Sequence, residues 1–216
     1  MNILVMGANG QLGRLLVQYI VEGGIHQAKV LLQNQAQVAF FKDKGIDSFI
    51  FNAKDSIEKF LIAIRNIDVL VITEHSVTDL NSDTLEDIDD TIKLLEALRY
   101  SKLKRIIHIS SFETNKEEWV QSPLYFRPIL IKYYYVDQWL RASSLNYTII
   151  HPGNLTDKKG TGYVKIIESD IMSGEISKED VAKIVLACIE NPQTIRKEFK
   201  VITGKCSIDE AVKHVL

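Results

Sequence analysis

The sequence contains little cysteine and no residue pattern typical of a metal site. Its 216 residues include two cysteines and five histidines. Cys188 and Cys206 have neither metal-ligand spacing nor the density of a secreted disulfide framework. The histidines form no H-E-x-x-H or similar motif. We therefore predict no metal site and a reducing, cytoplasmic setting.

Long apolar runs and an excess of one charge are also absent. No apolar run approaches the roughly 18 to 20 residues that a membrane-spanning helix needs. A first strand expected to begin at Ile3 leaves no room for a signal peptide before it. The formal net charge is −2, with 46% hydrophobic and 25% charged residues. We predict a cytoplasmic monomer or homodimer that binds a small-molecule substrate and neither nucleic acid nor membrane.

Short β-branched segments alternate with segments of helical period along the chain. This alternation predicts an α/β Rossmann fold: a doubly wound parallel sheet of about seven strands, in the order 3-2-1-4-5-6-7, with helices on both faces. A single domain spanning residues 1–216 suits this length. Capping-box patterns predict helix starts at Asp55, Ser177 and Ser207. The expected strands are Ile3 to Met6, Lys29 to Leu32, Ser48 to Phe51, Asp68 to Ile72, Arg105 to Ile109, Tyr147 to His151 and Phe199 to Ile202.

Two connections are longer than a crossover between strands requires. They span 112–126, after the fifth strand, and 152–176, after the sixth. Both leave the carboxyl ends of strands, where open α/β sheets bind their ligands, and long loops in a compact domain are usually functional. We predict that both are substrate-side segments. For an aromatic residue such as Trp119, a packed cover over the sheet edge is the alternative.

The first strand runs directly into a loop with three glycines, Gly7, Gly10 and Gly13. In a dinucleotide-binding βα unit, the first glycine permits a tight turn, the second lets the backbone approach a pyrophosphate, and the third lets the helix pack on the strand. The N–H groups of the first helical turn then bind the phosphates. The spacing G-x-x-G-x-x-G is one residue longer than the common G-x-G-x-x-G.

Gln33 occupies the end of the second strand, where dinucleotide-binding proteins read the adenosine ribose. A carboxylate there would bind the ribose hydroxyls of NAD, and an arginine would pair with the 2′-phosphate of NADP. A glutamine amide can bond either group, so we expect weak discrimination. Arg14, next to Gly13, either supplies a compensating charge or is a solvated surface residue.

Further segments complete a family pattern in the correct order. They are Ser110-Ser111 at the end of strand five, Lys132, the turn Pro152-Gly153-Asn154-Leu155-Thr156-Asp157, and the helix start Ile176 to Ala182. Together with the glycine loop, they resemble the short-chain dehydrogenase/reductase superfamily, specifically its atypical extended members, the NmrA-like NAD(P)-binding proteins and the flavin/biliverdin reductase relatives. The resemblance covers nearly the whole chain. It implies NADP or NAD as the cofactor and favours NADP.

The resemblance also implies roles for individual residues. Ser110 or Ser111 would be the active-site serine, and Lys132 would bond the nicotinamide ribose. The implied cofactor-binding residues are Gly7, Asn9, Gly10, Gln11, Leu12 and Gly13 at the pyrophosphate, Gln33 at the adenosine ribose, Asn52 and Ala53 at the adenine, Thr73 and Glu74 along the ribose, and Pro152, Gly153, Asn154 and Leu155 beside the nicotinamide amide.

The chain departs from the superfamily pattern at the usual catalytic acid. Carbonyl reduction relies on Tyr-x-x-x-Lys, because one helical turn places the phenol beside the ammonium. Here Pro128 stands four residues before Lys132. Gln33 and His151 also stand where relatives commonly carry arginine. Tyr125 and Tyr135 are weak candidates for a substitute acid, and for His75 and His151 a structural hydrogen bond is favoured over proton transfer.

We therefore predict an NAD(P)H-dependent oxidoreductase that transfers hydride to a small conjugated acceptor such as a flavin or quinone. Such an acceptor collects its proton from water, so the protein supplies orientation and no strong acid. The alternative is a dinucleotide-binding redox sensor that reports to a partner protein and catalyses nothing. A sugar-nucleotide epimerase or dehydratase is a weaker third reading, because the chain is short and lacks the tyrosine that such chemistry uses.

Overall fold

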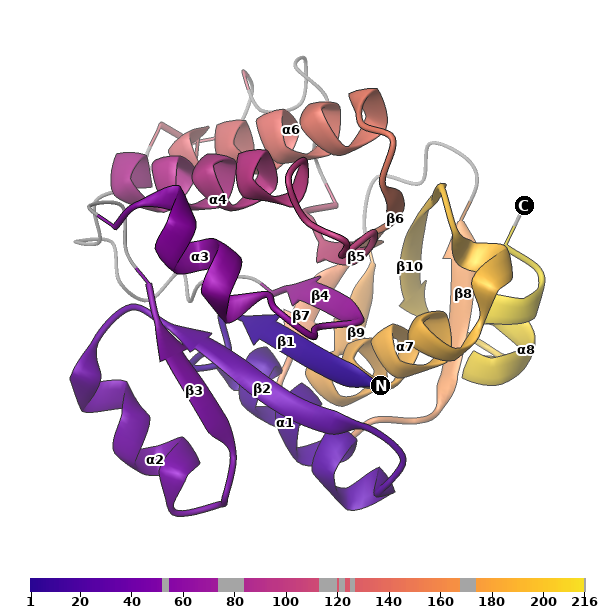
Figure 1. The fold of residues 1–216 in the computed structure, drawn as a ribbon. Helices are drawn as coiled ribbons and strands as arrows, with labels where there is room; N and C mark the ends of the chain where they lie inside the picture. The colour runs from indigo at the N-terminus through magenta and orange to yellow at the C-terminus, as the bar shows by residue number, and fades with distance from the viewer. Residues whose placement is uncertain are drawn as a thin grey trace. The chain divides into compact units, whose positions relative to one another are not determined.

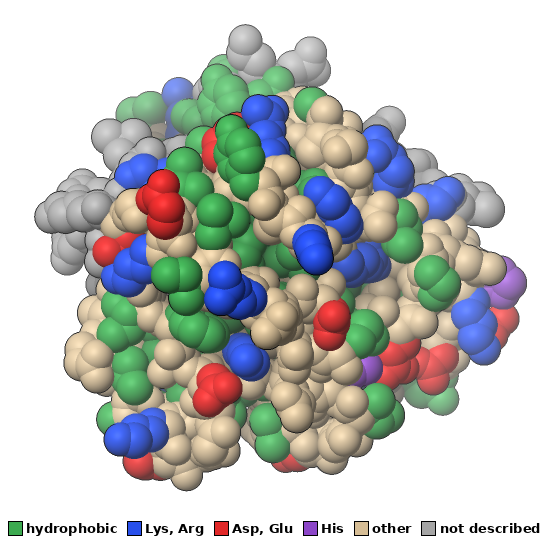
Figure 2. Space-filling model, in the orientation of Figure 1, with side chains coloured by type: hydrophobic (Ala, Val, Ile, Leu, Met, Phe, Trp, Pro, Cys, Tyr) green, Lys and Arg blue, Asp and Glu red, His purple; other side chains and the backbone are tan. Residues whose placement is uncertain are grey.

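A computed structural model describes residues 1–51, 55–73, 84–112, 120, 123–124, 127–167 and 174–215, with side chains left out for 84–90. It contains two compact units, Met1–Arg105 and Ile106–Leu216. The predicted α/β Rossmann class is confirmed, with a mostly parallel sheet and helices on both faces. No helix among the described residues is long and apolar enough to cross a bilayer. On the face drawn in Figure 2, acidic and basic side chains are interspersed.

The strands of the first unit lie in the order β3-β2-β1-β4 (Figure 1). All three pairings between them are parallel. The elements of this unit are β1 (Asn2–Met6), α1 (Gln11–Gly23), β2 (Gln27–Leu32), η1 (Gln35–Gln37), α2 (Val38–Lys42), β3 (Asp47–Ile50), α3 (Ile57–Ala63), β4 (Val69–Ile72) and α4 (Thr84–Leu98).

The central strands of this unit are buried along their length. All four residues of β4 are buried, as are the last four of β1. Parallel strands covered on both faces require such continuous apolar runs. Helix α1 turns Leu12, Leu16 and Ile20 to its buried side, which is the periodicity of a helix that packs on a sheet. This packing fixes where β1 ends and α1 begins.

The second unit has the strand order β5-β6-β10-β8-β11. β10 runs parallel to β6 and antiparallel to β8, and the short strands β7 and β9 form a separate parallel pair. The elements are β5 (Arg105–Ile109), α6 (Arg127–Ala142), β6 (Asn146–Pro152), β7 (Asn154–Thr156), β8 (Tyr163–Ile167), β9 (Glu175–Ser177), α7 (Lys178–Glu190), η2 (Pro192–Thr194), β10 (Lys197–Thr203), β11 (Cys206–Ser207) and α8 (Ile208–Lys213).

All seven predicted strands form, and the predicted order 3-2-1-4-5-6 is confirmed, with β10 as the seventh strand. The segment 152–176, predicted as a long connection after strand six, contains β7, β8 and the first two residues of β9. Each of these strands has three to five residues. Such short strands depend on partners elsewhere in the chain and leave too little periodicity to detect in the sequence.

Two of the three predicted helix starts are confirmed. The hydroxyl of Ser177 accepts from the Asp180 N–H at 3.0 Å, and that of Ser207 accepts from the Glu210 N–H at 3.4 Å. The start at Asp55 is wrong by one residue, because Ser56 caps α3. The Asp55 carboxylate pairs instead with Lys59, one helical turn ahead.

Candidate nucleotide-binding loop and polar cluster

The outer two glycines of the glycine loop are required by packing within the first unit. Gly7 has a left-handed φ of +79°, and a Cβ there would lie 2.5 Å from the Thr73 hydroxyl oxygen. That hydroxyl donates to the Met6 carbonyl at 2.8 Å, which holds the end of β4 against the end of β1. A Cβ on Gly13 would overlap the Gly7 carbonyl oxygen and the Ala8 Cα. The loop therefore folds back on the first turn of α1.

We expect Gly13→Ala to lower the free energy of unfolding by about 1 to 3 kcal/mol, because the added methyl group meets backbone atoms that cannot move aside. Gly23→Ala is the matched control at the other end of α1, where a Cβ would have no atom within 4 Å. It should be neutral or stabilising by about 0.5 to 1 kcal/mol. Urea denaturation of both variants measures the difference, and equal effects would contradict the packing argument.

Gly10, the middle glycine, is not required by its own backbone. It precedes α1 as N-cap with φ −68° and ψ 162°, which any residue can adopt. No side chain caps this end of α1, and the first turn carries no acidic residue. The helix N-terminus can therefore bind an anion through its N–H groups and the positive end of its dipole. Gly10 adds no side chain of its own to this end of the helix.

Several other residues predicted to bind the cofactor can be placed in the first unit. Thr73 follows β4 and is buried against the glycine loop. Gln33 follows β2, and its N–H donates to the Gln37 side-chain oxygen at 3.1 Å. The predicted contacts Asn52, Ala53 and Glu74 lie outside the described residues, as do His75, Trp119 and Tyr125.

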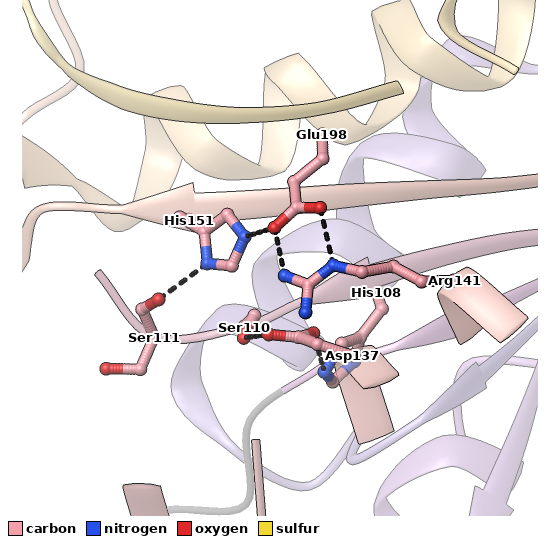
Figure 3. Close-up of polar contacts among 7 residues, drawn as sticks. All are labelled: His108, Ser110, Ser111, Asp137, Arg141, His151 and Glu198. Carbon is pink, nitrogen blue, oxygen red and sulfur yellow. Dashed lines mark hydrogen bonds and ion pairs between the residues drawn. The ribbon is translucent and has the colours of Figure 1, made fainter. Parts of the chain in front are cut away.

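A polar cluster of seven residues lies in the second unit (Figure 3). Its members come from the end of β5, from α6, from β6 and from β10, and they are His108, Ser110, Ser111, Asp137, Arg141, His151 and Glu198. Sequence reasoning found the two serines and His151 and missed the other four. Asp137 and Arg141 stand four residues apart on α6, the spacing that puts two side chains on one helix face, and this was the available signal.

Ser110 is bound to a buried carboxylate. Its hydroxyl donates to Asp137 Oδ2 at 2.8 Å, and Asp137 Oδ1 lies 3.5 Å from His108 Nε2. Asp137 has no exposed surface. Burial raises the pKa of Asp137 to about 6, against the lowering effects of His151 and of the Ser110 hydrogen bond. Of the two candidate serines, Ser110 is thus engaged inside the protein, and the half-buried Ser111 reaches the surface.

His151 is almost fully buried, and both of its ring nitrogens lie within hydrogen-bond distance of an oxygen. Nδ1 lies 2.7 Å from the Ser111 carbonyl oxygen, and Nε2 lies 2.8 Å from Glu198 Oε1. The ring therefore links the main chain of Ser111, after β5, to the carboxylate of Glu198 on β10. This geometry agrees with the favoured structural interpretation of His151.

Glu198 lies within hydrogen-bond distance of both Arg141 and His151. Arg141 donates from Nε to Oε2 at 2.8 Å and from Nη2 to Oε1, in the two-bond geometry typical of arginine and carboxylate. Burial alone would raise the pKa of Glu198, but the hydrogen bonds from Arg141 and His151 outweigh it and lower the pKa to about 2. The carboxylate is therefore ionised at neutral pH.

Helix α6 carries Lys132, the predicted nicotinamide-ribose contact, as a half-buried residue. Pro128 is the second residue of this helix, where its missing N–H has no intrahelical partner to lose. Tyr133 is only 5% exposed and belongs to the core, whereas Tyr135 is 58% exposed. Neither the proline nor the buried tyrosine can serve as an acid beside Lys132.

Pro152 is the last residue of β6, and Gly153 connects it to β7, which contains Asn154 and Leu155. The Gly153 N–H donates to the Val201 carbonyl at 2.9 Å, and a Cβ on Gly153 would lie 2.5 Å from the Gly174 carbonyl oxygen. Glycine is therefore required here by close packing. Among the described residues, no three His, Cys, Asp or Glu side chains are grouped to hold a metal ion.

Comparison with known families bears directly on the glycine loop. A family model described as NAD(P)H-binding matches residues 7–192, from the first glycine of the loop onward. The chain belongs to this NAD(P)H-binding family. The predicted relationship to NmrA-like NAD(P)-binding proteins is thereby confirmed.

Three relatives illustrate the range of this family. The "Uncharacterized sugar epimerase YhfK" of Bacillus subtilis (strain 168) is 32% identical over 218 residues, covering 100% of both chains. The solved structure of a candidate NAD-dependent epimerase/dehydratase from Bacillus halodurans is 28% identical, with a TM-score of 0.86 over 99% of each chain. The "Photosystem II assembly factor Ycf39" of Cyanophora paradoxa is 33% identical over 150 residues, which are 69% of this chain and 44% of that protein.

Proposed function

We propose that this chain is an NAD(P)H-dependent oxidoreductase that transfers hydride to a small conjugated acceptor, such as a flavin or quinone. The observation that carries the proposal is the bare Gly10 at an uncapped helix N-terminus, in a backbone conformation that does not itself need glycine. Membership of the NAD(P)H-binding family supports it. In this proposal the two units act as one NAD(P)-binding domain, and family resemblance favours NADP over NAD.

The glycine loop, from Gly7 to Gly13, holds the pyrophosphate in this proposal, and the bound dinucleotide supplies the hydride. Lys132 bonds the nicotinamide ribose, and the segment from Pro152 to Leu155 lies beside the nicotinamide amide. Because the Ser110 hydroxyl is engaged by Asp137, we assign the contact with substrate or nicotinamide to Ser111. Ser110 and His151 then act as positioning residues that fix the main chain after β5.

The proton for the reduced acceptor comes from water in this account. We therefore expect Tyr125→Phe and Tyr135→Phe to change kcat less than about threefold, since a general acid that takes part in turnover contributes about 10²- to 10⁴-fold. Stopped-flow or steady-state oxidation of NADPH by a quinone measures this for both variants. A loss of about 100-fold or more in either variant would identify that phenol as the acid and contradict the proposal.

A non-catalytic redox sensor is the second candidate. Pro128, where the superfamily carries its tyrosine, favours it, and one relative is named as an assembly factor. A sensor binds the reduced and oxidised dinucleotides with different affinities. It does not oxidise NADPH, whichever acceptor is supplied. The names of two other relatives point to epimerase chemistry, which we rank lower because the tyrosine that such chemistry uses is replaced by Pro128.

A further inference from the structure

Two cations in the first unit are held against one aromatic ring, next to the glycine loop. The guanidinium carbon of Arg14 lies 4.4 Å from the centroid of the Phe40 ring, and Lys44 Nζ lies 4.6 Å from the same centroid. Arg14 Nη2 also donates to Asn9 Oδ1 at 2.7 Å. Cation–π contacts of this kind restrain long basic side chains on an accessible surface, and the Phe40 ring is 38% exposed.

This basic site joins the two segments that flank the adenosine in a Rossmann fold. The ribose of the adenosine lies at the end of the second strand, and the pyrophosphate lies on the glycine loop. Here Phe40 and Lys44 belong to the stretch that follows β2, in and just after α2, while Asn9 belongs to the glycine loop. Arg14, in the first turn of α1, contacts both segments.

The charge around the site suits a phosphate. Residues 33–42 read Gln-Asn-Gln-Ala-Gln-Val-Ala-Phe-Phe-Lys and contain no carboxylate. The next two carboxylates are Asp43 and Asp47, and Asp47 faces Lys29 at 3.7 Å. The hydrogen bond to Asn9 uses one of the five N–H groups of the Arg14 guanidinium, so others can bind a second acceptor. A planar guanidinium matches phosphate oxygens better than an ammonium does.

We propose that Arg14, restrained by Phe40 and assisted by Lys44, binds the 2′-phosphate of NADP and makes the chain selective for NADP over NAD. Arg14 would then bind the phosphate that, in relatives, is bound by an arginine at the position of Gln33. The inference rests on the proposed NAD(P)H-dependent function for the dinucleotide itself. Because Arg14 is already held by Asn9 and Phe40, it loses little side-chain freedom when the phosphate binds.

Isothermal titration calorimetry with NADPH, NADH, 2′,5′-ADP and ADP tests this site without any turnover. The wild-type chain should bind NADPH at least about 10-fold more tightly than NADH. Arg14→Met should weaken binding of NADPH and 2′,5′-ADP by about 10- to 100-fold, which is the range for one charged hydrogen-bonding group. It should change the affinities for NADH and ADP less than about twofold. Lys44→Met should weaken NADPH binding by about 3- to 10-fold.

Arg65→Met is the matched control, because it removes another exposed arginine of the same unit. It should leave all four affinities unchanged. If Arg14→Met weakens NADPH and NADH by the same factor, Arg14 supports the loop through Asn9 and the 2′-phosphate site is refuted. Equal wild-type affinities for NADPH and NADH refute the site while the proposed function stands. A wild-type chain that binds neither dinucleotide overturns both.

Discussion

Gly10→Val should abolish dinucleotide binding and leave the fold intact. The backbone of Gly10 is extended, so valine fits it without strain. Its branched side chain would stand where a pyrophosphate approaches the first turn of α1, and the N–H groups of that turn would no longer reach the phosphates. We expect the Kd for NADPH to rise at least about 100-fold, equivalent to two charged hydrogen bonds. Nicotinamide fluorescence and calorimetry both measure this change.

Gly23→Val is the control for Gly10→Val, since it places the same side chain at the far end of α1, in open space. It should retain wild-type affinity. Valine at an N-cap position costs about 1 kcal/mol of stability, so urea denaturation should find Gly10→Val folded and only slightly less stable. Wild-type affinity for NADPH in folded Gly10→Val would remove the basis for placing the cofactor on this loop.

Glu198→Gln should destabilise the protein by about 1 to 3 kcal/mol at neutral pH. The substitution removes the carboxylate that pairs with Arg141 and with the buried His151 ring. Charged hydrogen bonds contribute about 1.5 to 3 kcal/mol, and the exposure of Glu198 and Arg141 to solvent lowers the expected loss toward about 1 kcal/mol. The free energy of unfolding from urea titrations measures the loss.

The control for Glu198→Gln is Glu210→Gln, which breaks a second Glu–His pair of nearly the same length. Glu210 Oε1 lies 2.9 Å from His214 Nε2, but both side chains are more than half exposed. Exposed pairs contribute about 0 to 1 kcal/mol, so we expect a change below about 0.5 kcal/mol. Equal losses of stability in the two variants would contradict the stabilising role given to Glu198 in the polar cluster.

The cluster also predicts how stability depends on pH. Because the pKa of Glu198 is lowered to about 2 in the folded state, its stabilising contribution is present above its ordinary value of 4.5 and is lost as pH falls toward 2. Asp137 acts in the opposite sense, because its pKa is raised to about 6. Its ionisation in the folded state costs free energy, and that cost develops as pH rises from about 4 to about 6. The Glu198→Gln variant should therefore lose the fall in stability that Glu198 causes in acid. It should keep the loss of stability that Asp137 causes as pH rises.

The parallel strands and the glycine loop could be predicted because their signals are local. Each buried strand is a continuous apolar run, and the three glycines stand at fixed spacing after the first of them. The strands β7, β8 and β9 could not be predicted in this way. Each is too short for a period to emerge, and pairing with distant residues determines it, as in the antiparallel register between β8 and β10.

The polar cluster could be predicted only in part, because its members come from four separate elements. The sequence identified Ser110 and Ser111 as candidates but did not show which of them is available to a ligand. That depends on the hydrogen bond from Ser110 to Asp137, which lies on α6. The sequence shows a histidine, His151, where relatives have arginine. Its contacts could not be predicted, because the two oxygens that it meets belong to Ser111, after β5, and to Glu198, on β10. For Arg14 it left two roles open, and contacts with Asn9 and Phe40 favour the binding role.

Oxidation of NADPH and NADH in the presence of a panel of flavins, quinones and aldehydes distinguishes the oxidoreductase from the redox sensor. Binding of each dinucleotide to the protein is first verified by titration, and Gly10→Val serves as the negative control for turnover. We expect acceptor-dependent oxidation with at least one flavin or quinone, little with simple aldehydes, and none in Gly10→Val. Tight binding of NADPH with no oxidation above background for any acceptor would contradict the oxidoreductase and favour the redox sensor.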